Sequence, residues 1–211
     1  MREDFTSTRA QVVRIAVFGE GLLLIIALPW FLLRSHHFTF LPLREQLLES
    51  FLITLPLLAL NYLLDLLVRR FGLFPSLADF RDAFLYPLSQ DLLVRDILVI
   101  ALFSGFGEEL LFRGVLTYEA SQLIGPTLGI LVVSSLFAYV HLIGMAKKYL
   151  FLLFLYFGVG IYFNYFSWFD GHIFSVCLSH ALFNFCSLLF LRKAAGDQLE
   201  LPQEISANTQ A

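Results

Sequence analysis

The stretch YLFLLFLYFGVGIYFNYF, residues Tyr149–Phe166, decides the fold class, because it is almost entirely aliphatic or aromatic and carries no charged side chain. A transmembrane helix needs about 20 mainly apolar residues, since hydrocarbon cannot hydrogen-bond an exposed backbone. Five further stretches meet or nearly meet this criterion. They are Arg14–Leu33, Leu47–Val68, Ile97–Leu111, Pro126–Met145 and Ile173–Leu191. The sequence therefore predicts an all-α, polytopic membrane helical bundle of about six transmembrane helices.

The composition of the whole chain also indicates that lipid surrounds much of the protein. Hydrophobic residues make up 58% of the 211 positions and charged residues 15%, whereas soluble domains average about 45–50% and about 25%. A soluble fold of this length could not hide that much apolar surface in one core. The net charge of -3 provides no basic patch of the kind that binds nucleic acid. We therefore expect a multi-pass protein of the cell membrane with lipid as a partner and no nucleic acid.

The chain is predicted to form a single transmembrane domain over residues 1–193, with a motif-bearing core at 92–191. Its third apolar stretch stays helical in pattern to Ile124, so we expect one long helix with a polar middle, ended by Gly125-Pro126. The connector 69–90 mixes charge with prolines and predicts a loop with an interfacial helix. Residues 194–211 are polar and are expected to form a disordered tail.

Ionisable side chains inside the bilayer are the first functional candidates, because burying each one is costly unless it is paired or hydrated. Glu109 and Arg113 are four residues apart, so they can form an ion pair on one helix face. Glu108 lies about 100° around the same helix and has no such local partner. We expect Glu108 to be satisfied by a side chain of another helix.

Two further polar pairs occur at helical spacing. Phe137 lies one turn before His141, and His180 lies one turn before Asn184. Each pair alone is more typical of a packed, hydrogen-bonded residue than of a catalyst. At about 1.5 Å per residue, however, Glu108 and His180 each lie roughly 18 Å from the cytoplasmic edge and His141 roughly 9 Å, a difference that helix tilt can close. A polar chamber in the cytoplasmic half of the bilayer is therefore expected.

Three motifs follow one another on successive apolar helices. They are Glu108-Glu109-x-x-x-Arg113, Phe137-x-x-x-His141 and His180-x-x-x-Asn184. Together they resemble the motifs of the CPBP family of intramembrane proteases, also called Abi or CAAX-protease-like, over about residues 92–191. The resemblance implies an intramembrane endopeptidase whose peptide or protein substrate can be membrane-anchored or lipidated.

Peptide hydrolysis needs an activated water, oxyanion stabilisation and a proton for the leaving amine. A carboxylate in a low-dielectric pocket can act as the general base near neutral pH, and Glu108 fits that role. The family resemblance implies that His141 shares the attacking water, while His180 and Asn184 donate hydrogen bonds to the oxyanion. The residues expected to support this site are Glu109, Arg113 and Phe137.

Other readings stay open at this point. Glu and His side chains are also zinc ligands, and a zinc-bound water would serve the same purpose. Because there is no His-Glu-x-x-His helix, we expect a metal-independent, glutamate-type mechanism with no cofactor, and keep zinc as the alternative. A non-catalytic membrane scaffold or immunity protein, or a transporter, could carry the same polar groups. A transporter should show broken helices or internal symmetry, and neither is visible.

Basic residues predict that both chain termini face the cytoplasm. With the N-terminus inside, only Arg34 and Arg44 fall on the outer side. Reporter fusions after Leu43 and after Ala194 should therefore report opposite sides of the membrane, and the same side for both would overturn this topology. The basic residues on the predicted inner side are Arg2, Arg9, Arg14, Arg69, Arg70, Arg81, Arg95, Lys147, Lys148, Arg192 and Lys193.

Overall fold

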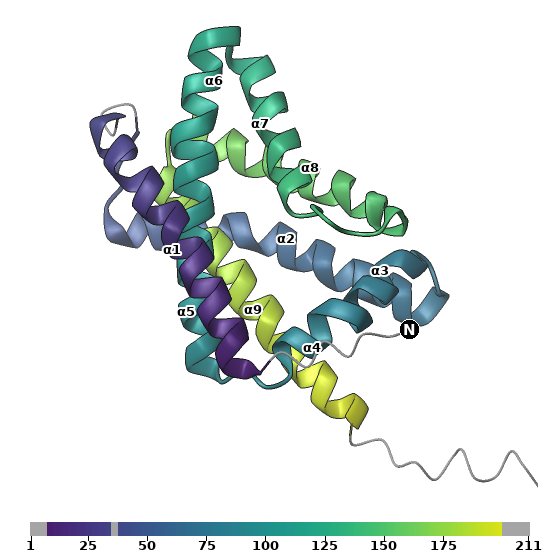
Figure 1. Cartoon of the computed structure of the whole chain (residues 1–211). Coiled ribbons are helices and arrows are strands. Elements are labelled where there is room, and N and C mark those ends of the chain that lie inside the picture. The colour runs from purple at the N-terminus through teal and green to yellow at the C-terminus, as the bar shows by residue number, and fades with distance from the viewer. Residues whose placement is uncertain (1–7, 35–37, 200–211) are drawn as a thin grey trace, which may run out of the picture.

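The computed structural model of the chain describes residues 8–34 and 38–199, and within these ranges every regular element is a helix (Figure 1). The predicted all-α membrane bundle is confirmed. Each of the six apolar stretches corresponds to a helix. The six are α1 (Arg9–Arg34), α2 (Leu43–Phe71), α5 (Val94–Glu109), α7 (Pro126–Val140), α8 (Leu150–Asn164) and α9 (Ile173–Leu199).

Four of these segments are long and apolar enough to cross a membrane: α1, α2, α9 and the helical stretch Lys147–Phe169 that contains α8. Their outer faces carry large apolar side chains with no protein cover, such as Ile15, Phe18 and Ile25, which are 72%, 78% and 72% exposed. Lipid is the solvent that suits such a surface. The two remaining predicted spans are α5, whose end is charged, and α7, which has 15 residues.

The long helix with a polar middle is present as three consecutive segments. α5 continues without a break into the π-helical stretch η3 (Leu110–Leu116) and then into α6 (Thr117–Ile124). A π-helical turn contains one residue more than an α-helical turn and often marks a functional site. Gly125, with φ of 85°, ends the helix, and Pro126 begins α7. The wide turn therefore starts directly after the two adjacent glutamates.

The connector after α2 is more helical than a loop. α2 ends at Gly72 in the left-handed conformation, with φ of 64°, a value that glycine adopts without strain. The chain then forms α3 (Pro75–Phe80), the π-helical η2 (Arg81–Leu85) and α4 (Tyr86–Ser89). These segments provide the helical element that we expected in this connector, and its position at the membrane interface stays a prediction.

The last helix extends beyond the predicted start of the C-terminal tail. α9 runs to Leu199, so residues 194–199 are helical, although we expected them to be disordered. The reason is tertiary packing, because Ala194 and Ala195 are buried against Tyr86 of α4. Residues 200–211 of the predicted tail lie outside the described residues.

Two glycines let α5 approach its neighbours closely. Helices α1, α5 and α9 run side by side in Figure 1. A Cβ atom on Gly105 would lie 2.6 Å from the backbone nitrogen of Ala181 and 2.7 Å from the carbonyl oxygen of Cys177, both on α9. A Cβ atom on Gly107 would lie 2.7 Å from the carbonyl oxygen of Glu20 on α1. α5 is therefore in backbone contact with helices on two sides just before Glu108.

The N-terminal ends of α1 and α5 lie at the same end of the bundle. The Nε atom of Arg9 is 2.5 Å from the Oδ2 atom of Asp96. The C-terminal end of α9 reaches α4 near this end as well (Figure 1). The N-terminal end of α1 and the C-terminal end of α9 therefore lie at the same end of the bundle, and the side of the membrane that this end faces stays a prediction.

The glycine contacts make a stability prediction. Gly105→Ala should lower the thermal unfolding temperature in detergent, because the added methyl group meets α9 backbone that cannot move aside. Overpacking of this kind costs about 1–3 kcal/mol. Gly158→Ala on α8 is the matched control, since a Cβ there meets nothing within 4 Å and alanine favours a helix. An unchanged unfolding temperature for Gly105→Ala would contradict the close contact.

Candidate active site

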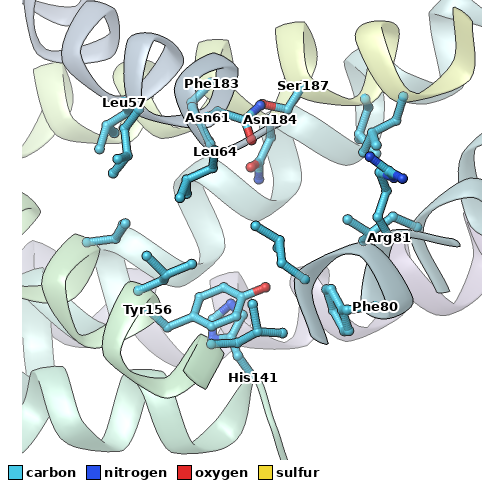
Figure 2. Close-up of a pocket in the computed structure, with 18 of the residues that line it drawn as sticks. Leu57, Asn61, Leu64, Phe80, Arg81, His141, Tyr156, Phe183, Asn184 and Ser187 are labelled. Atoms are coloured by element: carbon cyan, nitrogen blue, oxygen red, sulfur yellow. The ribbon is translucent and has the colours of Figure 1, made fainter. Parts of the chain in front are cut away.

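A cavity of about 400 Å³ lies inside the bundle and receives all four predicted catalytic side chains. Glu108 comes from α5, His141 from the C-terminal end of α7, and His180 and Asn184 from α9. Leucines and phenylalanines make up most of the remaining wall. Figure 2 shows His141 on one side of the cavity and Asn184 on the opposite side. The structure thus brings the three motifs to one chamber.

The two carboxylate oxygens of Glu108 have different surroundings. The Oε1 atom accepts a hydrogen bond from the Ser104 hydroxyl at 2.9 Å. The Oε2 atom lies 3.4 Å from Nε2 of His141 and, among the described residues, has no hydrogen-bond partner. Glu108 therefore has a polar neighbour on another helix, as expected, and also accepts a hydrogen bond from a residue of its own helix. The motifs did not point to Ser104, although its position four residues before Glu108 places it on the same face.

The orientation of His141 follows from its other ring nitrogen. Nδ1 is 2.8 Å from the carbonyl oxygen of Phe137, and a carbonyl only accepts, so Nδ1 carries the hydrogen. In the neutral ring, Nε2 is then an acceptor directed at Glu108. The rings of Phe137 and Tyr156 hold the imidazole, each with its centroid 4.4 Å away. With the ring neutral, two acceptors face each other, and a water molecule can donate one hydrogen to each.

Glu109 connects the motifs through a single oxygen atom. Its Oε1 accepts from Nη1 of Arg113 at 3.1 Å, which confirms the predicted ion pair, and from Nδ1 of His180 at 2.7 Å. Arg113 also lies 4.1 Å above the ring of Phe137, a favourable cation–π arrangement. Glu109 and Arg113 are 0% and 1% exposed, so this pair is shielded from water. The Nε2 atom of His180 is left for the cavity.

Asn184 is tied to the same carboxylate through Ser104. Its Nδ2 atom donates to the Ser104 hydroxyl oxygen at 3.0 Å. The His180 ring, one turn earlier on α9, stacks on Phe163 with a centroid distance of 5.4 Å. Neighbouring side chains therefore hold His180 and Asn184 in place, and both residues still line the cavity.

A comparison with protein families matches the part of the chain that carries these residues. Residues 90–186 match the family model of the type II CAAX prenyl endopeptidase Rce1-like domain. This segment, slightly less than half of the chain, is similar to the Rce1-like domain. The family resemblance seen in the three motifs is thereby confirmed, since all three lie within the matched residues. No curated protein and no solved structure is significantly similar to the chain.

A further carboxylate reaches the Rce1-like domain from outside its limits. Glu20 lies on α1 and packs against Gly107, with its Oε2 atom 3.4 Å from the position a Cβ would take there. Its Oε2 atom is buried and has no hydrogen-bond partner among the described residues. An acidic residue inside an apolar span is the sequence signal that could have marked it.

The donor set of the Rce1-like domain bears on the zinc alternative. Within the described ranges, no three His, Cys, Asp or Glu side chains are grouped as a metal ion requires. His180 directs one ring nitrogen at Glu109, so only Nε2 remains for any ligand in the cavity. Cys177 and Cys186 are both free thiols on α9 and are not cavity-lining residues.

The buried ion pair makes a prediction about folding. Arg113→Leu should lower the yield of folded protein more than Glu108→Gln, because the leucine variant leaves Glu109 without its cation in an apolar interior. Breaking a buried pair in this way costs about 3–5 kcal/mol, whereas glutamine keeps the volume of Glu108 and can still accept from Ser104. Size-exclusion profiles of the two detergent-solubilised variants provide the measurement. Equal yields would argue against a structural role for the pair.

Proposed function

We propose that the protein is a multi-pass endopeptidase of the cell membrane that hydrolyses a peptide bond with a glutamate-activated water. The observation that carries this proposal is the pair of atoms Oε2 of Glu108 and Nε2 of His141, 3.4 Å apart at the wall of a largely apolar cavity. Two acceptors at this separation can hold and orient one water molecule. The Rce1-like domain supports the reaction class.

Glu108 is proposed as the general base. It takes a proton from the bound water, and the resulting hydroxide oxygen forms a bond to the carbonyl carbon of the substrate. The carbonyl oxygen becomes an oxyanion, which hydrogen bonds stabilise as its charge develops. Collapse of this intermediate breaks the carbon–nitrogen bond, and Glu108 returns its proton to the leaving amine. Glu109, Arg113 and Phe137 hold the surrounding side chains in place.

The oxyanion donors are proposed to be Asn184 and His180. Asn184 has two amide hydrogens, of which one is donated to Ser104, so the second is available to the substrate. His180 directs Nδ1 at the Glu109 carboxylate, so Nε2 donates only when the ring is an imidazolium. The negative charge of Glu109 favours that cation. The Glu109 carboxylate is therefore proposed to support the chemistry as well as the fold.

The apolar cavity favours a substrate with a long hydrocarbon group. Most of its wall is aliphatic or aromatic and includes Leu57, Leu64 and Phe183 (Figure 2), while the lining residues with polar side chains include Asn61 and Arg81. We propose a lipidated or membrane-anchored protein tail, in keeping with the prenyl endopeptidase description of the matched domain. The bilayer would deliver such a substrate. We also propose that no metal is needed, since Glu108 and His141 together can activate water.

The decisive experiment measures cleavage by the purified protein in proteoliposomes. A panel of quenched fluorescent peptides with prenylated CAAX tails provides the probe, and mass spectrometry locates the cut. Glu108→Gln should lower kcat by about 100-fold or more with little change in KM, because general-base catalysis acts in the transition state. Glu45→Gln, at an exposed glutamate on α2, should cleave like the wild type.

Two outcomes would contradict the proposal. A Glu108→Gln variant with wild-type kcat would exclude the glutamate mechanism, and loss of activity with a zinc chelator would favour the metal alternative. An unbiased comparison of membrane peptides from cells with the wild type or Glu108→Gln extends the test beyond the chosen probes. Identical peptide sets would favour a non-catalytic scaffold.

A further inference from the structure

Ser104 lies between two of the proposed catalytic side chains, one from its own helix and one from α9. Its hydroxyl is 2.9 Å from Oε1 of Glu108 and 3.0 Å from Nδ2 of Asn184. The serine is 6% exposed and Glu108 is 7% exposed, so bulk water competes little for these hydrogen bonds. No motif in the sequence includes this serine.

The chemistry of the three groups fixes the direction of the hydrogen bonds. A carboxylate only accepts, and the amide nitrogen of asparagine only donates. A serine hydroxyl has one hydrogen, so it donates that hydrogen to Glu108 and accepts one from Asn184. The chain therefore runs from Asn184 through Ser104 to Glu108, and no other arrangement satisfies all three groups.

We propose that Ser104 is a positioning residue that aligns the general base with the oxyanion donor. This inference rests on the proposed function. By holding Oε1 of Glu108, Ser104 leaves Oε2 as the oxygen that faces His141 and takes the proton of the water. By accepting one amide hydrogen of Asn184, it directs the other toward the cavity. One hydroxyl thus orients two groups that act at opposite ends of the scissile carbonyl.

The backbone contact next to Ser104 explains how so short a side chain can do this. Gly105 allows α5 to lie against the backbone of α9 at Cys177 and Ala181. Asn184 is one turn beyond Ala181 on the same helix, so its carboxamide reaches the serine directly. Side chains held by rigid, closely packed helices keep catalytic geometry better than side chains on loops.

Ser104→Ala tests the inference with the same prenylated probe peptides. We expect kcat to fall about tenfold to hundredfold, the range for a lost hydrogen bond to a charged group, with KM nearly unchanged. Ser104→Thr keeps the hydroxyl and should recover most of the rate. Ser179→Ala is the matched control, because Ser179 is buried on α9 and bonds to Thr54 outside the cavity. It should keep the wild-type kcat.

A double-variant cycle measures the coupling between Ser104 and Asn184. Because the two groups act as a unit, adding Ser104→Ala to Asn184→Ala should cost less than it does in the wild type. Wild-type kcat for Ser104→Ala, with Glu108→Gln inactive, would overturn the inference and leave the proposed function intact. Equal losses for Ser104→Ala and Ser104→Thr would also overturn it, since packing would then be the cause. Wild-type activity of Glu108→Gln would overturn the proposed function itself.

Discussion

The carboxylate of Glu109 is the group on which the arrangement of the interior depends. One of its oxygens accepts from Arg113 on the same helix and from His180 on α9. A charge in this apolar interior is tolerated only when it is paired and hydrogen-bonded. The ion pair provides the opposite charge within one helix, and the bond to His180 then fixes α9 relative to α5. The positions of the polar groups in the cavity follow from this connection.

Backbone contact provides the second constraint, because short polar side chains can meet only where helices lie close. Gly105 permits that contact with α9, and Gly107 permits it with α1. Both glycines precede Glu108, so the general base proposed here projects from the most tightly enclosed part of α5. Glu20, from a helix outside the Rce1-like domain, also reaches this region. The site is thus supported by a larger part of the chain than the domain that carries its motifs.

Local spacing in the sequence was sufficient to predict the helices, the Glu109–Arg113 pair and the shared face of Phe137 and His141. Each of these depends on residues four apart or on a long apolar run. The bonds from His180 to Glu109 and from Asn184 to Ser104 join α9 to α5, and no periodicity indicates which side chains of two helices meet. The helical residues 194–199 were missed for the same reason, since the packing of Ala194 and Ala195 against Tyr86 is tertiary.

The π-helical stretch Leu110–Leu116 changes the directions in which the side chains of the following helix, α6, project. Before the stretch, Glu108 faces His141 of α7; after it, the hydroxyl of Thr117 donates to Asn164 of α8 at 2.9 Å. An added residue in a turn shifts the phase of the helix by about 100°. One continuous helix can therefore direct side chains at two neighbouring helices that lie on different sides of it. The number of residues in this stretch therefore cannot change without altering the contacts, whereas a surface loop tolerates insertions and deletions. Losing one residue from this stretch would restore an ordinary helical phase and separate the half that carries the glutamates from the half that holds α8.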